Sequence, residues 1–252
     1  MKVKTILVSQ PEPNVANSPY FDLQQKLKVK IDFRPFIHVE GVSAKVIRLL
    51  KIDVSQYTAI ILTSKNAVDH FFRVAEEMRY KVPEGLKYFC QSEAIAYYLQ
   101  KYVVYRKRKI YVGQRDFGDL VPLIKKYKEE KFLLPASDQL NPEAPQILNA
   151  LKVDWTQGTF YKTVMSDLSD LADVYYDVLA FFSPTGIKSL FKNFPDFKQN
   201  DTRIAVFGAS VQKEAEAHGL RVDIMAPSPE APSMTMALEK YIIKANKETK
   251  DK

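Results

Sequence analysis

The chain has 252 residues, of which 46% are hydrophobic, so it is long enough to bury one sizeable core or two smaller ones. Its single cysteine, Cys90, excludes an internal disulfide, and its three scattered histidines spell out no metal site. The net charge of +7 favours an acidic ligand or nucleic acid, but no helix-turn-helix, ribonucleoprotein motif or zinc module accompanies it.

The first half of the chain alternates short apolar runs with helical patterns, which is typical of parallel strands covered on both faces. The expected strands are residues 5–9, 30–39, 57–62, a run that ends at Phe89, and 110–112. The expected helices are residues 19–27, 43–50, 65–78, 93–102 and 118–128. Pro35 lies inside the second of these strands, which indicates an edge strand or a crossing segment.

The second half continues the alternation. The expected strands are residues 132–134, 153–164, 178–182, 204–206 and 221–224, and the expected helices are 142–151, 186–192, 210–218 and 233–246. Residues 153–164 alternate β-forming and polar side chains, as in a ribbon that is exposed on both faces. The polar tail, residues 247–252, is expected to fray.

Two sets of strand–loop–helix units resemble one another along the chain. Residues 59–72 parallel 177–190, residues 87–99 parallel 203–219, and residues 132–151 parallel 5–27. These repeats predict two α/β domains with parallel sheets, each a three-layer sandwich of similar topology. Strands at about 30–40 and 153–164 would pair as a two-stranded β linker, which gives one domain of residues 1–36 and 164–252 and another of 41–158.

Polar loops follow the expected strands, and ligands of parallel sheets bind beyond the carboxyl ends of the strands. Ser183 followed by Pro184 is typical of a helix N-terminus, whose N–H groups attract carboxylates and phosphates. These loops contain no glycine-rich phosphate motif, no histidine and one carboxylate, Asp138. Their hydroxyls and amides favour anion binding over hydrolysis. A single junction of this kind is more often a plain helix cap, and it is the whole set that favours binding.

Four segments together resemble the uroporphyrinogen-III synthase family of tetrapyrrole biosynthesis: ILTSKNAV at 61–68, FYKTV at 160–164, FFSPTGIKSL at 181–190 and the run from Ile204 to Leu238. The resemblance implies two α/β domains joined by a two-stranded linker, with the active site in the cleft between them. It also implies a lyase that closes the linear tetrapyrrole hydroxymethylbilane to uroporphyrinogen III, with loss of water and inversion of ring D, and without a metal or organic cofactor.

The resemblance assigns roles to individual residues. Tyr161 matches a tyrosine that could donate a proton to the leaving hydroxyl, and the alternative is a linker aromatic that only packs. The matched substrate-binding positions, together with neighbouring loop residues, are Thr63, Ser64, Lys65, Ser92, Ser137, Ser183, Thr185, Gly186, Lys188, Gly208, Ala209 and Ser210. Lysines 65, 162 and 188 would pair with substrate carboxylates, or else belong to a solvated face.

Two turns depart from the family pattern. The family's G-x-x-T turn is here Gln91-Ser92-Glu93-Ala94, and its GPTT turn is Gly208-Ala209-Ser210-Val211. The alternatives are therefore a catalytically weak relative, or a two-domain protein that binds an acidic small molecule. Because no apolar run is long enough to span a membrane, we expect a soluble, cytoplasmic protein that does not bind a membrane. The resemblance implies a monomer that acts on a small molecule, and the lack of a nucleic-acid-binding motif argues against nucleic acid as a partner.

Overall fold

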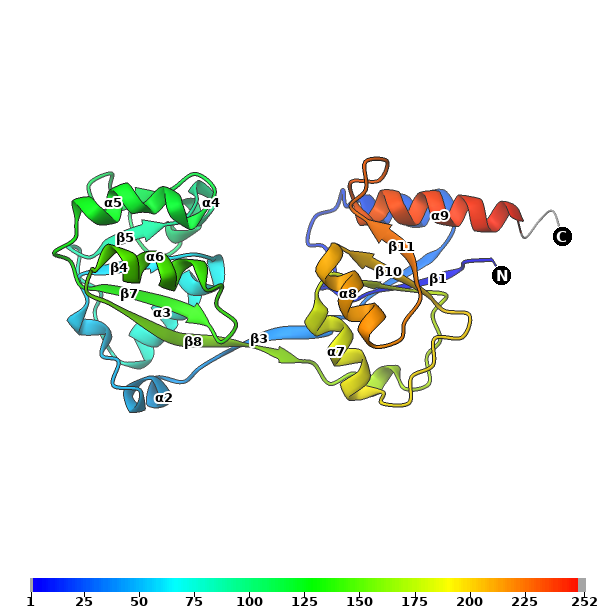
Figure 1. Ribbon diagram of the computed structural model, residues 1–252, viewed down its shortest axis with the longest axis horizontal. Coiled ribbons are helices and arrows are strands. Elements are labelled where there is room, and N and C mark those ends of the chain that lie inside the picture. Colours follow the sequence, from blue (N-terminus) through cyan, green and yellow to red (C-terminus); the bar gives the residue numbers. More distant parts are fainter. Residues whose placement is uncertain (1, 249–252) are drawn as a thin grey trace. The chain divides into compact units, whose positions relative to one another are not determined.

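The computed structural model describes residues 2–248, and the chain divides into two compact units. Unit 1 contains the residues up to His38 and those from Val164 onward, and unit 2 is Val39–Thr163. Each unit is a sheet flanked by helices (Figure 1). Lys247 still belongs to the last helix, α9 (Met234–Glu248), whereas residues 249–252 of the tail that is expected to fray lie outside the described residues.

The sheet of unit 1 has five parallel strands in the order β11-β10-β9-β1-β2. They are β1 (Thr5–Val8), β2 (Lys30–Phe33), β9 (Val178–Phe181), β10 (Arg203–Phe207) and β11 (Val222–Ala226). The helices of unit 1 are α1 (Pro19–Leu27), α7 (Pro184–Asn193), α8 (Ala209–Ala217) and α9, with a 3-10 turn, η3 (Ser169–Leu171), before β9.

Successive side chains of the unit 1 strands enter two different hydrophobic cores, because they point to opposite faces of the sheet. Ile6 of β1 packs with Leu23 of α1 and Leu238 of α9. Leu7, the next residue, packs in the other core with Ile187 of α7, and helix α8 also contributes side chains to this second core. Unit 1 is therefore a three-layer sandwich.

The sheet of unit 2 has six strands in the order β3-β8-β7-β4-β5-β6. They are β3 (Ile37–Gly41), β4 (Ala59–Leu62), β5 (Lys87–Cys90), β6 (Ile110–Val112), β7 (Phe132–Ser137) and β8 (Trp155–Met165), and the pairs among β4 to β8 are parallel. The helices are α2 (Ala44–Leu49), α3 (Lys65–Glu77), α4 (Glu93–Leu99), α5 (Val121–Lys126) and α6 (Glu143–Leu151), with 3-10 turns η1 (Val54–Gln56) and η2 (Phe117–Leu120).

Unit 2 also has one core on each face of its sheet. Ile60 of β4 packs with Phe71 of α3, and α2 and α4 cover the same face. Ile61 packs on the other face with Leu148 of α6 and Ile124 of α5. The prediction of two three-layer α/β sandwiches with parallel sheets is confirmed.

The paired repeats in the sequence occupy equivalent positions in the two sheets. In unit 1, β9, β10 and β11 lie in succession, with β1 and then β2 on the other side of β9. In unit 2, β4, β5 and β6 lie in succession, with β7 and then β8 on the other side of β4. The three pairs of similar segments thus correspond to β4 and β9, β5 and β10, and β7 and β1.

Several predicted element boundaries are wrong, and helix α4, for example, ends at Leu99 and not at Tyr102. Residues 30–39 form two strands, β2 and β3, because the chain leaves the unit 1 sheet at Arg34-Pro35-Phe36. Residues 118–128 form the turn η2 followed by the shorter helix α5. The strand expected at 132–134, β7, continues through Pro135 to Ser137 beside β8. Its pairing with β4 ends at Leu133, so the missing N–H of Pro135 costs no hydrogen bond to β4.

Strand β8 shows a change of register beside β7. Ala136 of β7 pairs with Thr159, but Ser137, the next residue, pairs with Tyr161, so that Phe160 is skipped. Such a bulge bends the strand and turns the following side chain to a new direction. Phe160 and Tyr161 consequently enter the same hydrophobic core, although adjacent residues of a regular strand point to opposite faces.

Within the described residues, none of the helices has the length and the apolar character that crossing a membrane requires.

Candidate active site

In each sheet the strand order reverses at one point, between β1 and β9 in unit 1 and between β4 and β7 in unit 2. Ligands of parallel sheets bind beyond the carboxyl ends of strands at such a switch point. The residues at or just after these four strand ends are Ser9, Ser183, Ser64 and Ser137. Ser64, Ser137 and Ser183 are among the substrate-binding residues that the sequence predicts, and Ser9 is the last residue of the expected strand 5–9.

Ser183 begins helix α7 in unit 1. Its Oγ accepts a hydrogen bond from the Gly186 N–H at 3.1 Å, and Pro184 is the first helical residue. A Cβ added at Gly186 would lie 3.4 Å from Ser183 Oγ and 3.9 Å from Ser9 Oγ. Ser183, Thr185 and Gly186 therefore form the first turn of α7, and the loop that follows β1 lies beside it.

Gly208 joins β10 to α8 with a φ of +94°, a conformation that glycine adopts without strain. Its N–H donates to the Ala226 carbonyl at 2.6 Å, so this N–H already holds β11. Ala209 and Ser210 are exposed in the first turn of α8. Lys188 lies further along α7, with its ammonium 3.6 Å from the Glu214 carboxylate.

In unit 2, Ser64 connects the start of helix α3 to Tyr161. Ser64 Oγ accepts a hydrogen bond from the Ala67 N–H at 3.0 Å and lies 3.0 Å from the Tyr161 hydroxyl. Only 7% of Tyr161 is exposed, and burial raises the pKa of its phenol. Tyr161 therefore keeps its proton at neutral pH, as a proton donor must.

His70 holds the ring of Tyr161 from the side of helix α3. The two rings are stacked with centroids 5.1 Å apart. His70 Nδ1 accepts a hydrogen bond from Arg73 Nε at 3.1 Å, and Arg73 also donates to the carbonyl of Phe160 at 3.1 Å. Glu77 forms an ion pair with Arg73. These contacts fix the position of Tyr161 relative to α3.

The sequence did not identify His70 as a site residue. Ala67, His70 and Val74 are spaced as residues on one helix face, and Ala67 and Val74 are fully buried. That spacing is a signal that the histidine faces inward. The stacking partner, however, is 91 positions away in the chain and cannot be read from helical periodicity.

Replacing His70 by glutamine should weaken the pH dependence of stability. Burial, with help from Arg73, lowers the pKa of His70 against the opposing effects of Asp69 and Glu77. An unfolded histidine has a pKa of about 6.5. The contribution of His70 to the free energy of unfolding is therefore fully present above about pH 6.5. It is lost as the pH falls toward and through the lowered pKa of His70 in the folded protein, because the unfolded chain takes up the proton more readily.

Urea denaturation at a series of pH values from 7 down to 5 measures this effect. This pH range begins just above the pKa of an unfolded histidine and extends below it, because the pKa of His70 is lowered in the folded protein. We expect the midpoint of the wild type to fall more steeply than that of the His70→Gln variant. Equal slopes for the two proteins would show that His70 titrates alike in the folded and the unfolded chain.

The only carboxylate expected in the strand-end loops is used inside unit 2. Asp138 Oδ1 accepts from the Ser137 hydroxyl at 3.1 Å and from the Thr163 N–H at 3.1 Å. The Asp138 N–H donates to the Tyr161 carbonyl at 3.2 Å. Asp138 and Ser137 thereby fasten the end of β7 to β8, and the Asp138 charge is partly neutralised by these donors.

The remaining predicted residues of unit 2 lie at the same edge of the sheet. Thr63 is half-buried between β4 and α3, and the Lys65 ammonium is 5.4 Å from the centre of the Tyr98 ring. Ser92 is the N-cap residue of α4 and makes no side-chain capping bond. Arg115, which the sequence reasoning did not single out, follows β6 at this edge, and its carbonyl accepts from the Gln91 side chain at 3.5 Å.

A family model described as uroporphyrinogen-III synthase HemD matches residues 22–236. The chain belongs to this family. The match spans most of both units and confirms the resemblance that the four sequence segments indicate. Among curated proteins, none matches the sequence significantly.

Solved structures of uroporphyrinogen III synthases have the same fold. The structure of the protein from Helicobacter pylori is 18% identical, covers 96% of this chain and 99% of its own, and gives a TM-score of 0.59. A mutant enzyme from Thermus thermophilus is 13% identical, with the same two coverages and a TM-score of 0.53. At these identities the similarity establishes the fold, while family membership rests on the family model.

Proposed function

We propose that this protein is a uroporphyrinogen-III synthase, a lyase that converts hydroxymethylbilane to uroporphyrinogen III with loss of water and inversion of ring D. The observation that carries the proposal is the family match over residues 22–236, which includes Ser64, Tyr161 and Ser183. The proposal includes action as a cytoplasmic monomer without a metal or organic cofactor.

The substrate carries eight carboxylates, and the strand-end loops suit such a ligand. They present serine and threonine hydroxyls, first-turn N–H groups of α3, α4, α7 and α8, and the cations of Lys65 and Arg115. Charge-assisted hydrogen bonds to carboxylates are roughly twice as strong as neutral ones. The net charge of +7 adds a general attraction for a polyanion.

Tyr161 acts as the general acid in this proposal. Its phenol donates a proton to the leaving hydroxyl, which departs as water, and the phenolate regains a proton when the cyclised product loses one. Ser64, 3.0 Å from the phenol oxygen, can hydrogen-bond the phenolate while it exists. The reaction consumes no net proton, and it needs no group beyond those of the chain and the substrate.

Product identity depends on geometry more than on acid–base chemistry. Without restraint the activated tetrapyrrole closes at the unsubstituted carbon of ring D and gives the type I isomer. Holding the chain so that the substituted carbon is attacked instead is a positioning effect, and such effects lower barriers by several kcal/mol, up to about 7–11. Many carboxylate contacts to the hydroxyls, N–H groups and cations of the strand-end loops would supply this restraint.

Incubation of the full chain with freshly made hydroxymethylbilane tests the proposal. The products are oxidised to porphyrins and the isomers are separated by chromatography. We expect the type III isomer in the presence of the protein and the type I isomer in buffer alone. Type I product at all protein concentrations would overturn the enzymatic function.

Replacing Glu93 by glutamine should improve substrate binding. Glu93 is exposed in the first turn of α4, within the Gln91–Ala94 turn that departs from the family's G-x-x-T. Two like unit charges about 6 Å apart in water repel by about 0.7 kcal/mol, so we expect KM to fall about threefold. Steady-state kinetics measure KM. The control is Glu76→Gln, which removes an exposed carboxylate near the carboxyl end of α3, away from the strand-end loops. A higher KM for Glu93→Gln would contradict the expectation.

A further inference from the structure

Arg73 of helix α3 binds several segments of unit 2 at once. Its Nη2 donates to the Val42 carbonyl, just after β3, at 2.7 Å and to the Phe160 carbonyl of β8 at 3.1 Å. Its ion-pair partner, Glu77, accepts a hydrogen bond from the N–H of Ala44, the first residue of α2, at 2.8 Å. Arg73 therefore ties α3 to β8, to the segment after β3 and, through Glu77, to α2.

The same guanidinium determines which nitrogen of His70 carries the proton. Arg73 Nε donates to His70 Nδ1 at 3.1 Å. A guanidinium has donors and no acceptor, so Nδ1 is the unprotonated nitrogen and the proton of the neutral ring is on Nε2. A proton on Nδ1 would set two donors against each other. Arg73 thus favours an uncharged His70, the ring that stacks on Tyr161.

The charged groups around His70 act in opposite directions. Burial, and after it the positive charge of Arg73, lowers the pKa of His70, whereas the carboxylates of Asp69 and Glu77 raise it. Tyr161, which faces His70 from β8, is a phenol whose own pKa is raised by burial, so it adds no charge at neutral pH. Loss of Arg73 would therefore raise the pKa of His70, because a cation is removed and Glu77 loses its partner.

Gly41, the last residue of β3, leaves the space that the guanidinium occupies. A Cβ added at Gly41 would lie 2.7 Å from Cζ and Nε of Arg73 and 2.8 Å from Nη2. Non-bonded carbon atoms prefer separations of about 3.5–4.0 Å, so an alanine would push the guanidinium away from its acceptors. The φ of Gly41 is outside the left-handed region, so the need for glycine comes from Arg73 and not from the backbone.

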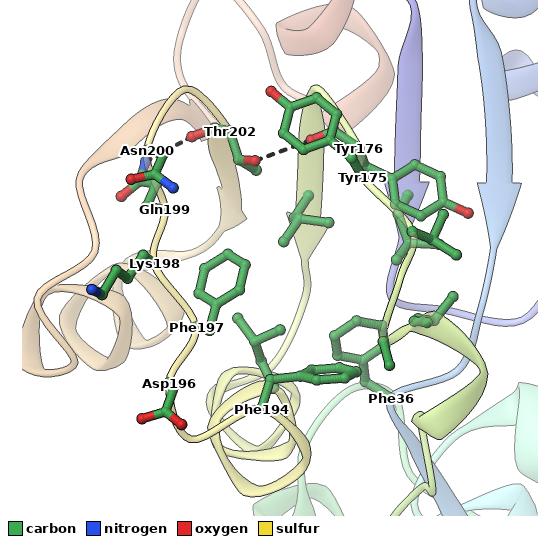
Figure 2. A pocket seen from close by; sticks show the side chains of 16 residues that line it. Phe36, Tyr175, Tyr176, Phe194, Asp196, Phe197, Lys198, Gln199, Asn200 and Thr202 are labelled. Atoms are coloured by element: carbon green, nitrogen blue, oxygen red, sulfur yellow. Dashed lines mark hydrogen bonds between the residues drawn. The ribbon is translucent and has the colours of Figure 1, made fainter.

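The polar groups beside a cavity of about 370 Å³ in unit 1 are arranged more locally (Figure 2). There the Thr202 hydroxyl donates to the Tyr176 carbonyl at 3.1 Å, and Gln199 donates to the Thr202 carbonyl at 3.0 Å. These bonds join neighbouring loops and point to no ligand. The bonds of Arg73 to Val42 and Phe160, in contrast, reach residues 31 and 87 positions away.

We propose that Arg73 is a positioning residue for Tyr161 and that Gly41 supplies the space that Arg73 needs. Arg73 touches neither the phenol nor the strand-end loops. It keeps His70 uncharged against the face of the Tyr161 ring, and it holds the backbone carbonyl that directly precedes Tyr161. The effect on catalysis rests on the proposed function, whereas the effect on His70 does not.

Nitrogen-15 NMR of labelled histidine side chains in the full chain tests the effect on His70 without substrate. At pH 7 the wild type should show His70 with an unprotonated Nδ1, and Arg73→Gln should lose this preference and give a higher pKa for His70. His70→Gln identifies the signal. Arg79→Gln removes an exposed cation just after α3 and should change nothing. A protonated Nδ1 in the wild type, or an unchanged pKa of His70 in Arg73→Gln, would overturn the proposal.

Kinetics test the effect on Tyr161. Arg73→Gln and Gly41→Ala should each lower the rate constant of uroporphyrinogen III formation about tenfold, because small displacements of a reacting group cost this much or more. KM should stay within about twofold, since neither residue lies in the strand-end loops. Gly85→Ala is the matched control, because a Cβ there meets nothing within 4 Å. If Arg73→Gln does not fold, Arg73→Lys takes its place, since lysine lacks the planar fork of donors.

Combining Gly41→Ala with Arg73→Gln separates positioning from general damage. Once the guanidinium is absent, Gly41→Ala should lower the rate by less than about twofold. Two effects that multiply to about 100-fold would overturn the role of Gly41, and a wild-type rate in Arg73→Gln would overturn the positioning of Tyr161. Type I product alone from the wild type would overturn the proposed synthase and the catalytic effect with it, and the NMR comparison would still decide whether Arg73 controls His70.

Discussion

Replacing Tyr161 by phenylalanine is expected to lower the rate constant of uroporphyrinogen III formation about 100-fold, with little change in KM. The variant keeps the ring, and therefore the stacking on His70, but it loses the proton donor. General acid catalysis by a positioned side chain typically contributes 10²-fold or more, which is about 2.7 kcal/mol of the barrier. Single-turnover measurements with hydroxymethylbilane separate this step from product release.

Two further variants make the result specific to the phenol of Tyr161. Tyr57→Phe removes another buried phenol from the same core and should keep full activity. Ser64→Gly removes the partner of the Tyr161 hydroxyl at little cost to the cap of α3, and we expect a loss of about tenfold or less. A loss below about threefold for Tyr161→Phe would leave Tyr161 as an aromatic residue that only packs.

The elements that the sequence predicts best are those with local signals. Helix α1 has the predicted bounds because Ser18 caps it, Pro19 is its first residue, and Lys28 ends it in the left-handed conformation. The buried strands β4 and β9 are recognisable because their apolar runs end in Ser64 and Ser183, each of which caps the next helix. Side chains within a few positions determine these features.

The geometry around Tyr161 could not be predicted, because it depends on partners that are distant in the sequence. Regular alternation in residues 153–164 places Phe160 and Tyr161 on opposite faces. The register change against Ala136 and Ser137 puts both on the face of α3 instead. Register belongs to a pair of strands, and an apolar pattern in one of them does not contain it.

Among the predicted anion-binding residues, some have positions set by local sequence signals and others have contacts that depend on partners distant in the sequence. Ser64 and Ser183 follow from local capping chemistry. The ion pair of Lys188 with Glu214, and the use of Asp138 to join β7 to β8, depend on which helices and strands become neighbours. That the buried Tyr88 hydroxyl finds no hydrogen-bond partner among the described residues is likewise a property of the folded chain, since in the sequence Tyr88 is one more aromatic residue in a strand.

Replacing Phe160 by alanine should lower the free energy of unfolding by about 3–5 kcal/mol, the usual cost of removing a fully buried aromatic ring. Phe160 is 0% exposed and packs in the core beneath α3, where its ring covers Gly158. Small domains are stable by only about 5–15 kcal/mol, so this loss is a large fraction. Urea denaturation followed by circular dichroism measures it.

The same variant connects packing to the proposed chemistry. The Phe160 carbonyl accepts bonds from the Val42 N–H at 2.9 Å and from Arg73 at 3.1 Å, so a shift of this residue also moves the groups that hold Tyr161. We therefore expect activity to fall even at temperatures where Phe160→Ala is folded. Lys162→Ala, two positions along β8 and exposed, should change stability by less than about 0.5 kcal/mol and serves as the control. A loss below about 1 kcal/mol for Phe160→Ala would mean that the ring is not part of the core, and the register that places Tyr161 beside Ser64 would then be wrong as well.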